Sequence, residues 1–131
     1  MWSLMLTPYE VAVKSVIPAV RRMVAKRLIS KYGLTQKEAA ELLGVSQSAI
    51  SRYGSEERGV AIDLESHKDV VERVEVLARE IASGLVAKAF IAKRIDEICD
   101  YSIKKGYMCE FHGRIDPEVT QINCSVCLEE S

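Results

Sequence analysis

The segment from residue 34 to residue 53 constrains the fold of this chain more than any other part of it. Thr35 is a preferred N-cap residue and opens one short helical pattern, Gln36–Leu43. Gly44 ends that pattern, because glycine adopts the left-handed backbone of a tight turn at little cost. Ser46 then caps a second pattern that runs to the end of the segment. The spacing predicts two short helices joined by a turn, a helix-turn-helix.

Each position of this unit has a suitable occupant. Ala39 is small where the two helices should cross, and Val45 should fill the angle between them. Leu42 and Ile50 complete the expected internal core. The second helix leaves short polar or basic side chains exposed, namely Gln47, Ser48, Ser51 and Arg52. Such side chains reach base edges and phosphates in a major groove without steric excess, so we expect them to contact double-stranded DNA.

The segment resembles the helix-turn-helix of the Cro and phage-repressor (XRE-type) family. Gln36 matches the glutamine that begins the family's second helix, and the resemblance implies that it binds a DNA phosphate. Gln47 and Ser48 match the pair that touches base edges in several repressors. The wider spacing, from Pro18 through Gly59 to a Cys/His tail, is similar to a family of predicted archaeal transcriptional regulators. The resemblance implies a lambda-repressor-like helical domain in a DNA-binding regulator.

Two further helices are predicted before this unit. Thr7, followed by a proline and then by Glu10, has the pattern of a capping box and starts a helix over about residues 8–16. Pro18 disfavours helical backbone at the residue before it, which separates a second helix over about residues 18–31. The apolar face of this second helix consists of Val20, Val24 and Leu28.

Residues 67–105 carry an apolar stripe of helical period, with a break at Ser83 and Gly84. The stripe consists of Val70, Val74, Leu77, Ile81, Ile91, Ile95 and Ile98. A single helix-turn-helix covers few base pairs, and symmetric dimers are the usual remedy. The stripe is therefore a candidate homodimer interface, and the alternative is that it packs on the chain's own N-terminal helices.

Because no run of strand period precedes residue 106, we expect an all-α fold.

The four cysteines all lie in the last third of the chain, which favours metal binding over disulfides in a cytoplasmic protein. Cys109 and His112 are followed by Cys124 and Cys127, and two such pairs have the spacing of a zinc site. Four protein ligands leave no open position, so the zinc would be structural. Cys99 is either a buried helix residue or a replacement for His112, which would make a four-cysteine site for zinc or for an iron–sulfur cluster.

The net charge of −1 hides an asymmetry. Residues 1–60 hold nine Lys/Arg against five Asp/Glu, a net charge of +4, and residues 61–131 have a net charge of −5. The asymmetry suggests an anionic partner for the first half, with ordinary scatter as the alternative. Arg21, Arg22 and Lys26 lie off the apolar face of their helix, and they are more typical of a solvated face than of phosphate contacts.

These observations divide the chain into three parts. They are a DNA-binding domain over 1–60, a helical region and candidate dimerisation surface over 61–105, and a small zinc-binding tail over 106–131. The sequence contains no run of 18 apolar residues, so we expect no membrane-spanning helix. It also shows no catalytic motif. We expect a cytoplasmic, non-enzymatic transcription regulator. The alternatives are a redox or metal sensor that acts through its cysteines, and an RNA- or protein-binding module.

Overall fold

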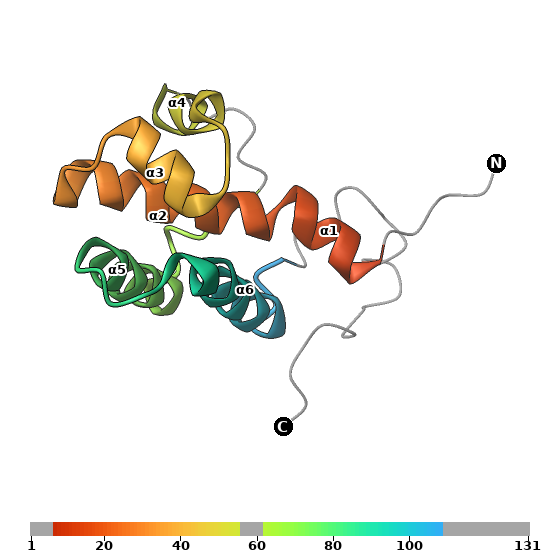
Figure 1. Cartoon of the computed structure of the whole chain (residues 1–131). Helices are drawn as coiled ribbons and strands as arrows, with labels where there is room; N and C mark the ends of the chain where they lie inside the picture. Colours follow the sequence, from red (N-terminus) through yellow and green to blue (C-terminus); the bar gives the residue numbers. More distant parts are fainter. Residues whose placement is uncertain (1–6, 56–61, 109–131) are drawn as a thin grey trace.

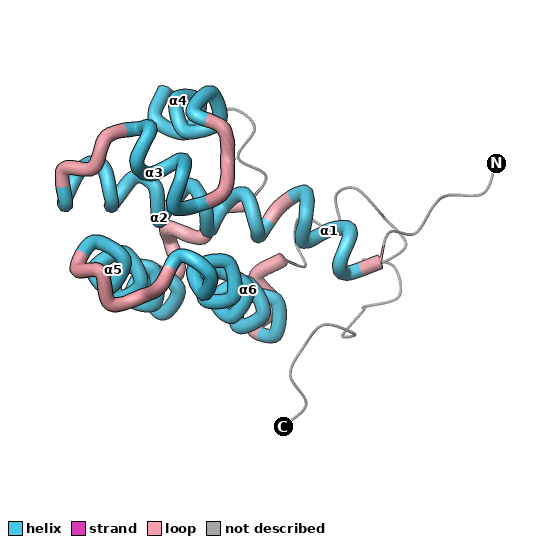
Figure 2. The backbone as a smooth tube through the Cα atoms, in the orientation of Figure 1, coloured by secondary structure: helices cyan, strands magenta, loops and turns pink. Residues whose placement is uncertain are grey.

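The computed structural model describes residues 7–55 and 62–108, and within these ranges the regular structure is entirely helical (Figures 1 and 2). This confirms the all-α expectation for the described part of the chain. In chain order the helices are α1 (Pro8–Lys14), α2 (Val16–Tyr32), α3 (Gln36–Leu43), α4 (Gln47–Ser55), α5 (Lys68–Ala82) and α6 (Lys88–Lys104). The predicted break after residue 82 is confirmed, since Gly84 has a φ of 74° and α6 starts four residues later.

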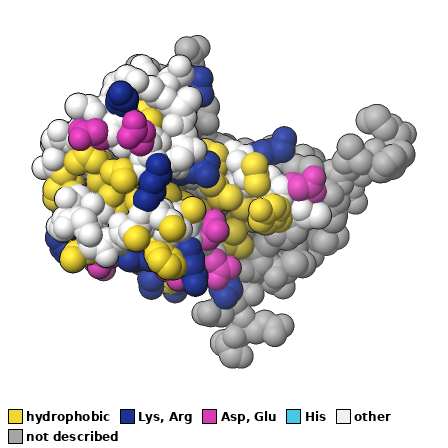
Figure 3. All heavy atoms as spheres, viewed as in Figure 1, with side chains coloured by type: hydrophobic (Ala, Val, Ile, Leu, Met, Phe, Trp, Pro, Cys, Tyr) yellow, Lys and Arg dark blue, Asp and Glu magenta, His cyan; other side chains and the backbone are white. Residues whose placement is uncertain are grey.

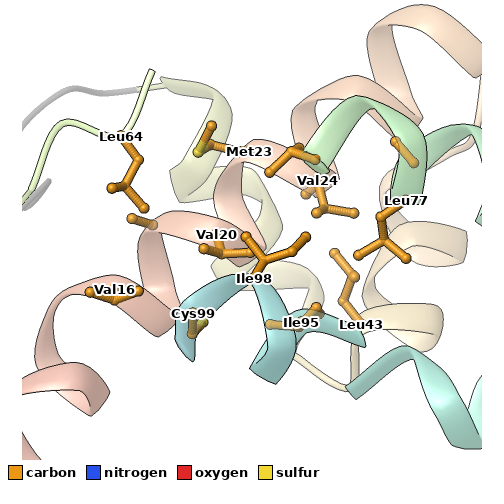
Figure 4. Close-up of a cluster of buried hydrophobic side chains, with 14 of the residues drawn as sticks. Val16, Val20, Met23, Val24, Leu43, Leu64, Leu77, Ile95, Ile98 and Cys99 are labelled. Carbon is orange, nitrogen blue, oxygen red and sulfur yellow. The ribbon is translucent and has the colours of Figure 1, made fainter. Parts of the chain in front are cut away.

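Helix α2 is the centre of the molecule and packs against all five other helices. Helices α3 and α4 lie on one side of it, and α5 and α6 lie on the other (Figure 1). Val20, Val24 and Leu28 recur every four residues along α2 and are fully buried. They meet Leu77 of α5 and Ile98 of α6 in one hydrophobic core (Figure 4). The segments before and after residue 60 therefore share a single core.

The apolar stripe of residues 70–98 is part of this core. All seven of its side chains are buried within the chain, and Val70, Val74 and Leu77 have no exposed surface. The prediction that the stripe forms a homodimer interface is wrong, and its alternative, packing on the chain's own N-terminal helices, is correct. The physical reason is that α2 already covers this face of α5 and α6, which removes its apolar surface from water.

The boundary between the first two helices differs from the prediction, because it falls at Ser15 rather than next to Pro18. Ser15 has φ −131° and ψ −73°, and its hydroxyl donates to the Val11 carbonyl at 2.7 Å. Pro18 is the third residue of α2. The first four backbone N–H groups of a helix have no partner inside it, so a proline in this turn loses no hydrogen bond.

Charged residues from the two halves of the chain pair across the α2–α5 contact. Arg27 on α2 donates to Glu75 on α5 at 2.7 Å and to Glu65, which precedes α5, at 2.9 Å. Lys31, one turn further along α2, donates to the same Glu75 at 2.8 Å. Part of the positive charge of residues 1–60 is therefore neutralised inside the chain, and the excess of +4 overstates the charge left for an anionic partner.

The last described turn is attached to the start of α5. The Tyr107 hydroxyl donates to Asp69 at 2.8 Å, and its ring stacks on His67 at 3.7 Å between centroids. Tyr101 on α6 donates to the same Asp69 oxygen at 2.6 Å. These two hydrogen bonds, led by that from Tyr101, lower the pKa of the Asp69 carboxyl. The Tyr107 contacts therefore hold the end of the described chain against the start of α5, and the next side chain, Met108, is fully buried.

Candidate DNA-binding face

The first helix of the predicted unit begins where the sequence indicates. Thr35 accepts a hydrogen bond from the Glu38 backbone N–H at 3.0 Å, and the Glu38 carboxylate accepts one from the Thr35 backbone N–H at 2.8 Å. This reciprocal capping box satisfies two N–H groups that the helix itself leaves without a partner. Gln36 is the first residue of α3, and its side chain is exposed.

The turn between α3 and α4 also has the predicted geometry. Gly44 adopts the left-handed backbone, with φ 69° and ψ 33°, and the Val45 N–H donates to the Ala40 carbonyl at 3.1 Å. Ala39 is fully buried where α3 packs into the core. Val45 is half-buried and packs against that core, as expected of the residue between the two helices. The small residue and the turn glycine are both where a helix-turn-helix needs them.

Helix α4 begins at Gln47 because Ser46 caps it. The Ser46 hydroxyl accepts a hydrogen bond from the Ala49 N–H at 3.1 Å. Ile50 is 2% exposed and anchors the middle of the helix in the core. The helix extends to Ser55, two residues beyond the end of the predicted pattern at Tyr53.

The four residues predicted to face DNA share one side of α4. Gln47, Ser48, Ser51 and Arg52 are all exposed, while Ile50 between them is buried. Positions i, i+1, i+4 and i+5 of a helix lie along one stripe. The surface over α4, at the top of Figure 3, is mostly white, and α4 itself carries no acidic side chain. The face therefore presents hydrogen-bonding groups, and Arg52 adds a positive charge.

The observed environment of one residue, Arg22, differs from the one that the sequence predicted. Arg22 was expected on a solvated face, but its side chain is half-buried, and its Nε–H donates to the Tyr53 backbone carbonyl at 3.1 Å. Arg22 lies on α2 and Tyr53 near the end of α4, so the bond joins two helices. No local pattern could have indicated this contact, because it depends on how α2 and α4 pack.

The predicted metal ligands Cys109, His112, Cys124 and Cys127 lie outside the described residues. Within residues 7–55 and 62–108, no group of three or more His, Cys, Asp or Glu side chains is arranged to hold a metal ion. Cys99 is buried on α6 beneath α2, as the first of its two interpretations predicted (Figure 4). Burial raises the pKa of its thiol to about 12, and the Asp96 carboxylate adds to that shift.

Three comparisons with known proteins were made, and one of them bears on this geometry. Residues 24–63 match an XRE-type helix-turn-helix family, which consists of DNA-binding regulators. The match covers less than half of the chain, and it contains α3, the turn and α4. No curated protein and no solved structure matches the chain. A search of the described residues for a helix long and apolar enough to cross a membrane found none.

Proposed function

We propose that this protein is a sequence-specific DNA-binding transcription regulator in which α4 enters the major groove. The observation that carries the proposal is the exposed stripe of Gln47, Ser48, Ser51 and Arg52, on a helix whose opposite side is anchored by the buried Ile50. A rigid helix with short polar side chains on its outer face suits the width of the major groove. The family match over residues 24–63 supports the same conclusion.

The chemistry of each side chain on this stripe determines which DNA group it can contact. The Gln47 amide can donate to and accept from adenine, and the Arg52 guanidinium can donate two hydrogen bonds to guanine. Ser48 and Ser51 are short enough to contact either kind of base. Gln36 lies at the first position of α3, where the positive end of the helix dipole favours a phosphate oxygen. Gln36 would therefore set the register of the protein on the backbone.

The test begins with the selection of bound sequences from a random DNA pool. Truncating Gln47 or Arg52 to alanine should then weaken binding to the selected site by about 1–3 kcal/mol, with little effect on random DNA. Arg79→Ala is the matched control for the arginine, because Arg79 is exposed on α5, on the other side of α2. If Arg52→Ala and Arg79→Ala change the specific affinity equally, the assignment of Arg52 to base contacts is refuted.

We further propose that the protein acts as a homodimer. One helix-turn-helix makes few base contacts, and two copies on a palindromic site double them. The buried stripe of residues 70–98 is not available for this purpose, so the dimer must use residues that remain exposed. Light scattering with the protein at micromolar concentration tests the assembly. A monomer mass both in free solution and on the selected DNA would refute it.

A structural zinc ion on Cys109, His112, Cys124 and Cys127 is the third part of the proposal. Its support is the spacing of these residues and the burial of Cys99, which disfavours the thiolate that a metal ligand needs. Metal analysis of protein purified without chelator should find one zinc per chain, lost in Cys124→Ser while the six helices persist. Iron with sulfide, lost in Cys99→Ser, would instead support an iron–sulfur sensor.

A further inference from the structure

Three of the contacts that hold helix α4 differ in their range along the sequence. Its first turn is capped locally by Ser46, and its middle is held in the core by Ile50. Its C-terminal part is held by Arg22, whose Nε–H donates to the Tyr53 carbonyl at 3.1 Å across 31 residues of sequence. Of these three contacts, the Arg22 hydrogen bond is the one that joins α4 to α2, the central helix of the fold.

The chemistry of the contact suits a helix C-terminus. The last four carbonyls of an α-helix have no N–H partner within the helix, and in α4 Tyr53 carries one of them. A guanidinium at this end also meets the negative end of the helix dipole. Because Arg22 is half-buried, the bond is partly shielded from water and is stronger than an exposed one.

The position of the contact connects it to the predicted base readers. Tyr53 directly follows Arg52 and lies two residues after Ser51, so the restraint acts within one turn of both side chains. Without this bond, the C-terminal part of α4 would be held by the packing of the half-buried Tyr53 side chain on the core. Such packing is less directional than a hydrogen bond, so this part of α4 could change its angle on α2. Direct hydrogen bonds to base edges tolerate little displacement. Such a change would therefore weaken the base contacts more than the attraction between the protein's positive charges and the phosphates.

We propose that Arg22 is a positioning residue that determines DNA specificity by fastening the C-terminal part of α4 to α2. The inference rests on the proposed DNA-binding function, and it goes beyond it by assigning specificity to a side chain that faces the protein backbone. It also separates Arg22 from a phosphate ligand, which would contribute charge without affecting the choice of sequence.

The experiment compares Arg22→Met, Arg22→Lys and the control Lys26→Met. Lys26 lies one turn along α2 and is exposed, so its substitution removes the same charge from the same helix face. Each full-length protein is first measured without DNA, by hydrogen exchange of the α2, α4 and α5 amides. The affinities for the selected site and for random DNA are then measured from 50 to 300 mM salt.

For Arg22→Met we expect about tenfold faster exchange in the C-terminal part of α4, with α2 and α5 unchanged. Binding to the selected site should fall at least tenfold, binding to random DNA less than threefold, and the salt dependence should stay as in the wild type. Arg22→Lys keeps the charge but has no N–H at the Nε position, so it should give intermediate specificity. Lys26→Met should not change α4 exchange or the ratio of specific to random binding.

Two results would overturn the proposal, each by its own readout. Unchanged exchange in α4 of Arg22→Met would show that the bond does not restrain the helix. Equal losses on selected and random DNA, with the salt slope reduced by about 0.9, would identify Arg22 as a phosphate ligand instead. A wild-type protein that selects no sequence would refute the proposed function and the claim about specificity, while the exchange measurement would still decide whether Arg22 restrains α4.

Discussion

Replacing Arg27 with methionine removes its ion pairs with Glu65 and Glu75, while the Lys31–Glu75 pair and the helices remain. The Arg27 side chain is 13% exposed, and its Nε–H donates to Glu75 at 2.7 Å. Nη1 and Nη2 donate to the two carboxylate oxygens of Glu65 at 3.1 and 2.9 Å. Methionine keeps the aliphatic stem and a similar helix propensity, but it makes none of these hydrogen bonds.

The size of the effect follows from the exposure of the partners. Hydrogen bonds to charged groups contribute about 1.5–3 kcal/mol each when water is excluded. Here Glu65 is 48% exposed and Glu75 is 29% exposed, so both carboxylates regain water when Arg27 is lost. We therefore expect Arg27→Met to lower the free energy of unfolding by about 2 kcal/mol in total. At about 4 °C per kcal/mol for a domain of this size, Tm should fall by about 8 °C.

Lys31→Met is the matched control. Lys31 also binds Glu75, at 2.8 Å, but its side chain is 53% exposed and it pairs with one carboxylate rather than two. Its loss should cost no more than about 0.5 kcal/mol. Urea unfolding followed by far-UV circular dichroism measures both variants. If the two free energies of unfolding differ by less than about 0.5 kcal/mol, the assigned strength of the Arg27 network is wrong.

The same network has a defined dependence on pH. Hydrogen bonds from Arg27 lower the pKa of Glu65, and those from Lys31 and Arg27 lower the pKa of Glu75. A carboxyl whose folded pKa is lowered contributes its full stabilisation above the unfolded value near 4.5, and the contribution is lost as pH falls through the folded value. The stability difference between wild type and Arg27→Met should therefore be constant near neutral pH and shrink below about pH 4.5. A difference that persists unchanged at pH 3 would contradict this assignment.

Three further predictions test other parts of the fold. Gly44→Ala should cost about 1–2 kcal/mol by urea unfolding, because φ is 69° and no atom lies within 4 Å of the added Cβ, so strain rather than a clash decides the cost. A cost near zero would refute the left-handed turn. Tyr107→Phe should raise the pKa of Asp69 partway to its usual range in an NMR titration, because Tyr101 still donates to it; an unchanged pKa would refute the Tyr107 bond. Cys99 should resist alkylation at pH 8 until the protein unfolds, because it is 4% exposed and its thiol has a pKa of about 12. Peptide mass spectrometry measures the labelling, and fast modification of the native protein would contradict the burial.

The helix-turn-helix could be predicted from the sequence because its determinants are local. The capping box joins Thr35 to Glu38, three positions along the chain, and the Gly44 turn and the Ser46 cap each act within one helical turn. These contacts are hydrogen bonds and backbone conformations between residues close in sequence, and the identities of those residues largely specify them. The outward stripe of α4 follows from the same register, since the buried Ile50 determines which side chains face away from the core.

The first helix boundary shows the limit of a local rule. Pro18 was expected to separate two helices, but it sits in the first turn of α2, and the break falls at Ser15. A proline is compatible both with a helix boundary and with the first turn of a helix, and residue identity alone does not distinguish these positions. In the structure the break lies at Ser15, whose hydroxyl donates to the Val11 carbonyl, and Val11 and Val16 on either side of it are both fully buried.

The amphipathic pattern of residues 70–98 identified which side chains avoid water, and the structure confirms every one of them as buried. The pattern could not identify what covers them, because burial against α2 and burial against a second copy remove the same apolar surface from water. The Arg22 contact has the same cause, since an arginine on a helix surface has the same local sequence whether it faces solvent or another helix. Periodicity and capping act over a few residues and are encoded locally, whereas the partner of a helix face depends on long-range packing, here the placement of α2 between α4 on one side and α5 and α6 on the other.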